Sequence, residues 1–190
     1  MIRSLPRRLR NRVAETIIAA GYDASARREL ETVAGGDSRG WLDPAQRELQ
    51  PRLHDRAKAA LRALASVPAH AGGAGVADSL AFAGALFDAG LYFEVHEVLE
   101  PHWVRASDAA EREALQGLIQ VAVGYQHFAD GNVAGARSLL EQGGSRLHGR
   151  SVFGVDFDRV ARAAVTAAGA LPAPPVPPRF PRAAAGVIRS

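Results

Sequence analysis

The chain has 190 residues, with 23 basic and 20 acidic side chains and no cysteine. This length allows one domain with a hydrophobic core and appended segments, and the lack of cysteine excludes a disulfide framework, a thiolate metal site and a cysteine nucleophile. No apolar run reaches the roughly eighteen residues of a membrane helix, and no signal-type apolar segment follows the basic start, so we predict a cytoplasmic protein without membrane insertion.

Charge is distributed unevenly along the chain. Residues 1–66 carry 13 basic and 8 acidic side chains, residues 78–150 carry 5 and 10, and residues 151–190 carry 5 and 2. The centre is therefore acidic and would repel the phosphates of a nucleic acid, so we expect none to bind there. The basic flanks can contact an anionic partner or lie over the acidic centre.

Helix start and stop signals divide the first part of the chain into three predicted helices. They cover residues 6–20, residues 23–33, and a segment from Pro44 to about Ser66 in which Pro51 breaks or restarts the helix.

Composition divides the whole chain into four parts. Residues 67–77 contain three glycines and no Asp, Glu, Lys or Arg, which is typical of a linker. This linker separates an N-terminal helical extension, residues 1–66, from a central unit, residues 78–170. The last part, residues 171–190, is a proline-rich tail that we expect to be extended and poorly packed.

The central unit has the punctuation of five successive helices, most of them with a capping side chain or a terminal glycine. Because their loops are short and no segment alternates like a strand, we predict an all-α fold, an antiparallel helical bundle or a pair of helical hairpins. The predicted helices are 78–88 with Asp78 as N-cap, 92–105, one reaching Ala129 and capped by Ser107 or Asp108, one reaching Leu147 and capped by Asn132, and 156–168 ended by Gly169.

The segment YFEVHEVLEPHW, residues 92–103, interleaves an imidazole and acids with large apolar side chains. In a helix, positions four and seven apart share a face, so His96, Glu100 and Trp103 form one ridge. The same periodicity directs Glu94 to nearly the opposite side, where we expect it to be solvated.

The following helix carries a second polar stripe on an apolar background. Gln116, Gln120, Gly124 and His127 fall on one face. Gly124 has no side chain, so it leaves room either for close helix approach or for a ligand. We expect the two polar stripes to face each other inside the fold.

A first hypothesis is a buried polar cluster with a structural or ligand-binding role, because buried polar groups must be paired and paired groups specify packing. Its members are the polar residues of the two stripes and Glu97, which flanks the first: His96, Glu97, Glu100, Trp103, Gln116, Gln120 and His127.

A second hypothesis is a divalent metal site, and it implies a hydrolase-like reaction. His96 and Glu100, at positions i and i+4, can grip one ion, with His127 or Glu97 as a further ligand. Mixed imidazole and carboxylate ligands suit zinc, manganese or iron, and Glu97 would then act as a general base towards bound water. The pattern is not an established one, because HExxE lacks the second histidine of HExxH.

A third hypothesis is a helical interaction module. Residues 128–143 are similar to the second helix of a tetratricopeptide repeat, although no 34-residue period is present. The acidic centre would favour a basic peptide as the partner, and a homo-oligomer is also compatible with such a surface.

Residues 87–103 and 115–147 resemble the bacterial and archaeal family called domain of unknown function 309 (DUF309). The resemblance covers about residues 80–150 and implies a small helical bundle, without an activity to transfer. Pro101 departs from the family pattern, because it cannot donate to the Glu97 carbonyl and should kink or end the helix. The residues that carry the resemblance are His96-Glu97-x-x-Glu100-x-x-Trp103, Gln116-Gly117-Leu118-Ile119-Gln120, His127, Gly131-Asn132 and Gly135-Ala136.

Overall fold

The computed structural model describes residues 1–67 and 75–181, and it is all-α apart from one small hairpin. The prediction of an all-α fold is confirmed. In chain order the elements are α1 (Arg7–Ala19), α2 (Ala24–Ala34), the 3₁₀ helix η1 (Pro44–Leu49), α3 (Gln50–Ala65), α4 (Val76–Asp88), α5 (Tyr92–Arg105), α6 (Ala109–Ala129), α7 (Val133–Leu147), β1 (Ser151–Val152), β2 (Val155–Asp156) and α8 (Asp158–Ala170).

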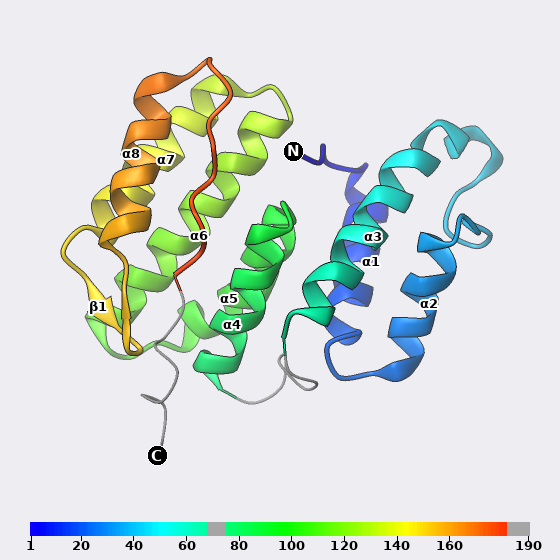
Figure 1. Cartoon of the computed structure of the whole chain (residues 1–190), viewed down its shortest axis with the longest axis horizontal. Helices are drawn as coiled ribbons and strands as arrows, with labels where there is room; N and C mark the ends of the chain where they lie inside the picture. Colours follow the sequence, from blue (N-terminus) through cyan, green and yellow to red (C-terminus); the bar gives the residue numbers. More distant parts are fainter. Residues whose placement is uncertain (68–74, 182–190) are drawn as a thin grey trace.

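The helices form two neighbouring groups, α1–α3 and α4–α8, with the N-terminal segment lying between them (Figure 1). Within the second group each helix packs on the next one along the chain, and α5 also packs on α1 of the first group. The buried apolar side chains of both groups form one continuous core. No described helix has the length and apolar character needed to cross a membrane.

Glycines set the close packing of α6 against α7. A Cβ on Gly124 would lie 2.8 Å from Leu140 Cγ, and one on Gly117 would lie 2.8 Å from Leu147 Cγ. On α7, a Cβ on Gly143 would lie 2.8 Å from the Gly117 carbonyl oxygen. Gly124 therefore serves close helix approach, one of the two roles that its position predicted.

Two of the predicted caps are confirmed. Asp108 accepts from the Glu111 amide at the start of α6, and Asn132 accepts from the Gly135 amide at the start of α7. Asp23, which was not predicted as a cap, accepts from the Ser25 amide at the start of α2.

Two predicted helix boundaries are wrong. The N-cap of α4 is Gly75, and Asp78 lies inside the first turn. Its negative charge there still interacts favourably with the positive end of the helix dipole. Gly169 lies inside α8, which runs to Ala170. The sequence pattern also missed β1 and β2, because strands of two residues are too short to show alternation.

Helix α5 continues through Pro101 to Arg105, so Pro101 does not end it. The loss of one backbone hydrogen bond is tolerated because the helix is packed against α4 and α6.

The described part of the tail, residues 171–181, is mostly exposed or partly exposed, but Leu171, Pro175 and Phe180 are buried and anchor it. Phe180 is buried against Phe87, with ring centroids 5.5 Å apart. Its amide donates to Asp88 at 3.0 Å, and Gly84 leaves the space that its ring fills. An aromatic side chain thus anchors a segment whose prolines predicted only extension. The rest of the predicted tail and most of the predicted linker lie outside the described residues.

Candidate functional site

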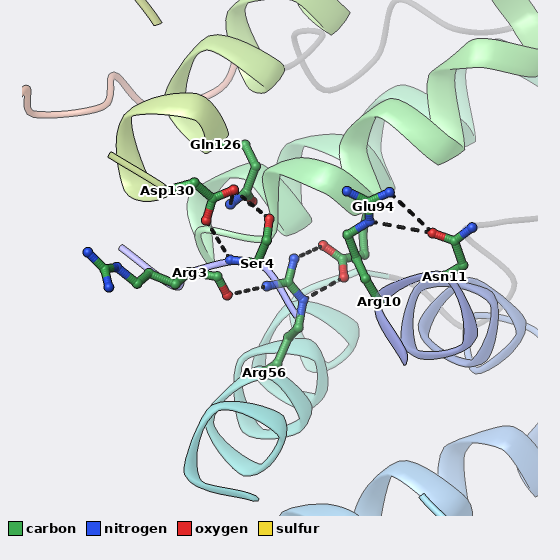
Figure 2. A network of polar contacts seen from close by, with 8 residues as sticks. All are labelled: Arg3, Ser4, Arg10, Asn11, Arg56, Glu94, Gln126 and Asp130. Carbon is green, nitrogen blue, oxygen red and sulfur yellow. Dashed lines mark hydrogen bonds and ion pairs between the residues drawn. The ribbon is translucent and has the colours of Figure 1, made fainter. Parts of the chain in front are cut away.

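A buried ion pair joins α3 to α5 beside the candidate site (Figure 2). Arg56 Nε and Nη2 donate to the two carboxylate oxygens of Glu94 at 2.8 and 2.9 Å, and both side chains are fully buried. Arg56 Nη1 also donates to the Arg3 carbonyl at 3.4 Å. The expectation that Glu94 is solvated is therefore wrong, because an arginine 38 positions earlier in the chain supplies its partner.

A second set of hydrogen bonds ties the N-terminal segment to the end of α6 (Figure 2). The Ser4 amide donates to Asp130 Oδ1 at 2.7 Å, and the Ser4 hydroxyl donates to Oδ2 at 2.6 Å. Gln126 Nε2 donates to the same Oδ2 at 3.1 Å. Asp130 thus holds the N-terminal segment against the end of α6.

A pocket of about 240 Å³ lies at this junction, between the N-terminal segment, α1, α5 and α6. It brings together two of the predicted site residues, one from each polar stripe. Its lining residues are Ser4, Arg10, Phe93, His96, Val123, Gln126, His127 and Asp130.

Two larger pockets, of about 470 and 530 Å³, lie under the tail and between α7 and α8. Among the described residues, neither is lined by a member of the polar stripes or by a buried polar side chain without a partner. Chemistry, and not size, therefore selects the smaller pocket as the candidate site.

Gln126 has an unusual environment for a buried amide. The residue is 6% exposed, and its Oε1 has no hydrogen-bond partner among the described residues. Its orientation is fixed by chemistry, because only Nε2 can donate to the Asp130 carboxylate. A buried hydrogen-bond acceptor without a partner among the described residues therefore belongs to a residue that lines the pocket.

The tautomer of His127 follows from its neighbour Asn132. Asn132 Oδ1 accepts from the Gly135 amide, so its Nδ2 is a donor, and this Nδ2 lies 2.7 Å from His127 Nδ1. Neutral His127 then carries its proton on Nε2, which makes Nε2 a donor. Gly135 permits this arrangement, since a Cβ there would lie 2.6 Å from His127 Nδ1.

His96 sits between two carboxylates on α5. Its Nδ1 is 3.0 Å from Glu97 Oε1, and its Nε2 is 3.9 Å from Glu100 Oε2. Because a carboxylate accepts, Nδ1 carries the proton, and neutral His96 keeps a lone pair on Nε2. The imidazole is 28% exposed and the Glu100 side chain 47%, so an ion could reach both.

Arg10 lines the pocket without an acidic partner. Its guanidinium carbon lies 4.0 Å from the centroid of the Phe93 ring, and its Nε and Nη2 are each 3.4 Å from Asn11 Oδ1. Within residues 1–67 and 75–181, Arg10 forms no ion pair and its Nη1 has no hydrogen-bond partner. Its charge is stabilised mainly by the ring face and by solvent.

The glutamines of the second stripe are not gathered at this pocket. Gln120 accepts from Arg146 Nε at 3.1 Å and donates to Gln142 at 3.2 Å, so it faces α7 and not α5. Gln116 is partly buried and lies outside the pocket. The prediction that the two stripes face each other therefore fails for Gln120, whereas His96 and His127 do line one pocket.

Trp103 also lies outside the pocket, near the end of α5. The Arg112 guanidinium carbon is 5.0 Å from its ring centroid, and Arg112 Nη1 donates to its carbonyl at 3.2 Å. Its buried Nε1 has no partner among the described residues.

His102, on the same helix, contacts the Ser79 hydroxyl of α4 at 2.8 Å. Burial, together with the charge of Arg105, lowers the pKa of His102 below the ordinary imidazole value. The contact therefore involves the neutral imidazole over more of the acidic range than an exposed histidine would allow.

Four polar lining residues were not predicted from sequence. Asp130 lies four positions after Gln126, and this spacing places them on one helix face, which is a signal that could have paired them. Ser4 and Arg10 carry no such signal, because only the packing of the N-terminal segment brings them to α5 and α6.

Comparison with known proteins supports the family resemblance. Residues 80–139 match the model of the family described as "Domain of unknown function (DUF309)". No curated protein matches the chain, and no solved structure does. The matched segment contains the pocket residues of α5 and α6, whereas Ser4 and Arg10 come from outside it.

Proposed function

We propose, from the premise that residues 80–139 are a DUF309 domain, that this chain binds a small polar ligand in the pocket between its N-terminal segment, α1, α5 and α6. The observation that carries the proposal is that Gln126 Oε1 is buried and has no hydrogen-bond partner within residues 1–67 and 75–181. An unsatisfied buried acceptor costs about 1–3 kcal/mol, and a ligand that donates to it removes this cost.

The size of the pocket limits the ligand. A volume of about 240 Å³ corresponds to roughly eight water molecules at about 30 Å³ each. Drug-sized ligands need about 300–1,000 Å³, so the ligand is a compact molecule with fewer than about ten non-hydrogen atoms.

The alternative role for the same residues is purely structural. The bonds from Ser4 and Gln126 to Asp130 hold the N-terminal segment in place whether or not a ligand binds. A purely structural cluster, however, would be expected to satisfy all of its buried members, and Gln126 Oε1 is not satisfied.

The test is a ligand-observed NMR screen of compact polar fragments against the full chain and against Gln126→Met. Methionine keeps the length of the side chain and removes both polar ends, so fragments that bind the wild-type chain should lose most of their affinity. Gln116→Met is the matched control, because Gln116 lies on the same helix and outside the pocket. Equal binding by both variants, or no fragment that binds the wild-type chain, would show that the pocket is not a ligand site.

A second candidate function, divalent metal binding, rests on a separate observation. His96, Glu97 and Glu100 each offer a ligand atom, and these atoms lie within 4.8 Å of one another. The hydrogen bond from Nδ1 to Glu97 assigns Glu97 to orienting the imidazole, which is common for metal-bound histidines. His96 Nε2 and Glu100 are then the direct ligands, and Glu97 is not free to act as a general base.

Metal analysis by mass spectrometry tests this second candidate. The purified chain should carry zinc, manganese or iron in stoichiometric amount, and chelator or His96→Ala should remove it. His148→Ala is the control, because the His148 side chain is 72% exposed and lies outside this group. Metal retained in His96→Ala, or no uptake by the wild-type chain, would refute it.

A further inference from the structure

We propose that the ligand of this pocket is a small anion that also carries a hydroxyl or amino donor, with Arg10 binding the anionic group and Gln126 Oε1 accepting from the donor. This inference rests on the proposed function and names its ligand class. Each part is carried by a different side chain of the pocket.

The anionic group is assigned by Arg10. Among the described lining residues it is the one arginine or lysine, and no carboxylate of the described chain pairs with it. Its guanidinium carbon lies over the Phe93 ring, 4.0 Å from the ring centroid. An arginine held against an aromatic ring is partly ordered before the ligand arrives, and its remaining N–H groups match a carboxylate or a phosphate.

Asp130 does not cancel this preference. Three donors from Ser4 and Gln126 occupy most of the roughly four acceptor sites of its two oxygens. Each donor places a positive hydrogen against the carboxylate, which weakens the repulsion that its negative charge exerts on a bound anion.

The imidazole of His127 adds to the same polarity. The tautomer set by Asn132 makes His127 Nε2 a donor, which suits an anion. Among the described lining residues, Asp130 is the one acidic side chain. The donor on the ligand is assigned by Gln126 Oε1, the buried acceptor of a lining residue that has no partner among the described residues.

The placement of Arg10 gives this chain a selectivity that its DUF309 domain does not carry alone. The domain match begins at residue 80, whereas Arg10 and Ser4 belong to the N-terminal part. The buried contact from Arg56 to Glu94 and to the Arg3 carbonyl holds that part against α5. The recognition of charge is therefore supplied by the extension and the recognition of the donor by the family domain.

Four probes separate the two requirements. Glycolate carries a carboxylate and a hydroxyl, acetate lacks the hydroxyl, ethylene glycol lacks the charge, and inorganic phosphate carries both on one centre. We expect glycolate to bind the full chain with a Kd on the order of millimolar, and about tenfold or more tighter than acetate and ethylene glycol, since the loss of one hydrogen bond to a charged or buried group weakens binding by about that factor. The measurement is a chemical-shift titration by NMR, with inorganic phosphate run in parallel to show whether a phosphate is the preferred anion.

The variants assign the two roles. Arg10→Gln should abolish the advantage of glycolate over ethylene glycol, and Arg10→Lys should restore part of it. Arg7→Gln is the matched control on the same helix, because Arg7 is exposed and outside the pocket. Gln126→Met should make acetate and glycolate bind equally.

The outcomes distinguish this inference from the proposed function. Tight binding of glycolate or phosphate that depends on Arg10 supports it. If ethylene glycol binds the wild-type chain as tightly as glycolate does, the anion assignment is overturned while the pocket remains a ligand site. If neither glycolate nor phosphate binds, or if Arg7→Gln and Arg10→Gln lose binding equally, the inference is also overturned.

Discussion

Replacing Glu94 with leucine should remove much of the stability of this protein. The substitution keeps an apolar side chain of similar size on α5, but leaves the fully buried Arg56 guanidinium without its carboxylate. Loss of one partner of a buried ion pair costs about 3–5 kcal/mol, because the remaining charge is desolvated and unpaired. A natural domain is stable by only about 5–15 kcal/mol, so the variant should unfold at a much lower urea concentration.

The double variant Arg56→Met, Glu94→Leu tests the reasoning behind this magnitude. If the cost comes from an uncompensated charge, removing both charges should recover most of it, and the double variant should lie within about 2 kcal/mol of the wild-type chain. The lost donor to the Arg3 carbonyl accounts for part of any remaining difference. Urea unfolding followed by circular dichroism gives the four free energies of the cycle.

An exposed ion pair provides the comparison. Arg12 and Glu29 are 3.2 Å apart with side chains 45% and 43% exposed, so Glu29→Gln should change stability by less than about 1 kcal/mol. A cost for Glu94→Leu as small as that for Glu29→Gln would refute the account, as would a double variant whose cost equals the sum of the two single costs.

Three further predictions concern the helices around the site. Gly143→Ala should lower stability by about 1–3 kcal/mol, seen as a lower melting temperature, because its Cβ would meet backbone atoms of Gly117 and Val121 at 2.8 and 2.9 Å. As the control, Gly169→Ala in α8 places a Cβ with nothing within 4 Å and should stabilise the protein by up to about 1 kcal/mol. Equal effects of the two substitutions would contradict the packing described. Trp103→Phe should change the free energy of unfolding by no more than about 1 kcal/mol, because loss of an unpartnered Nε1 offsets the loss of apolar area, and a cost above about 2 kcal/mol would show that Nε1 is bonded. The pKa of His102 is lowered in the folded chain, so the unfolded chain binds more protons between that lowered pKa and the ordinary value of 6.5, and stability should fall as the pH drops through this range. In urea unfolding, the free energy of unfolding of His102→Gln should fall less between pH 7 and pH 5 than that of the wild-type chain. Parallel pH profiles would argue against the shift.

The sequence predicted the helices of the central unit closely, for physical reasons that are local. The extents of α5 and α6 followed from helical periodicity and from a cap such as Asp108, and these signals do not depend on the rest of the fold. The family resemblance also rested on residues close together in the chain, and the match over residues 80–139 confirms it.

The errors arose where a partner comes from a distant element. Periodicity correctly placed Glu94 on the face opposite His96 but could not show that Arg56 of α3 covers that face. Gln120 and His127 lie on one stripe of α6, but α6 has neighbouring helices on two sides, so parts of one stripe can pack against different helices. Gln120 accepts a hydrogen bond from Arg146 of α7 and does not face α5. Arg10 could not be assigned to the site from the sequence, because its place beside Phe93 depends on how α1 packs on α5.

The central claim is that His96 and His127 line one ligand pocket, and an NMR titration of the imidazole ring signals with glycolate tests it most directly. The account predicts that the signals of His96 and His127 shift along one saturation curve, while those of His54 and His148, which lie outside the pocket, stay unchanged. Signals that stay fixed for His96 and His127, or that move equally for all four histidines, would contradict it.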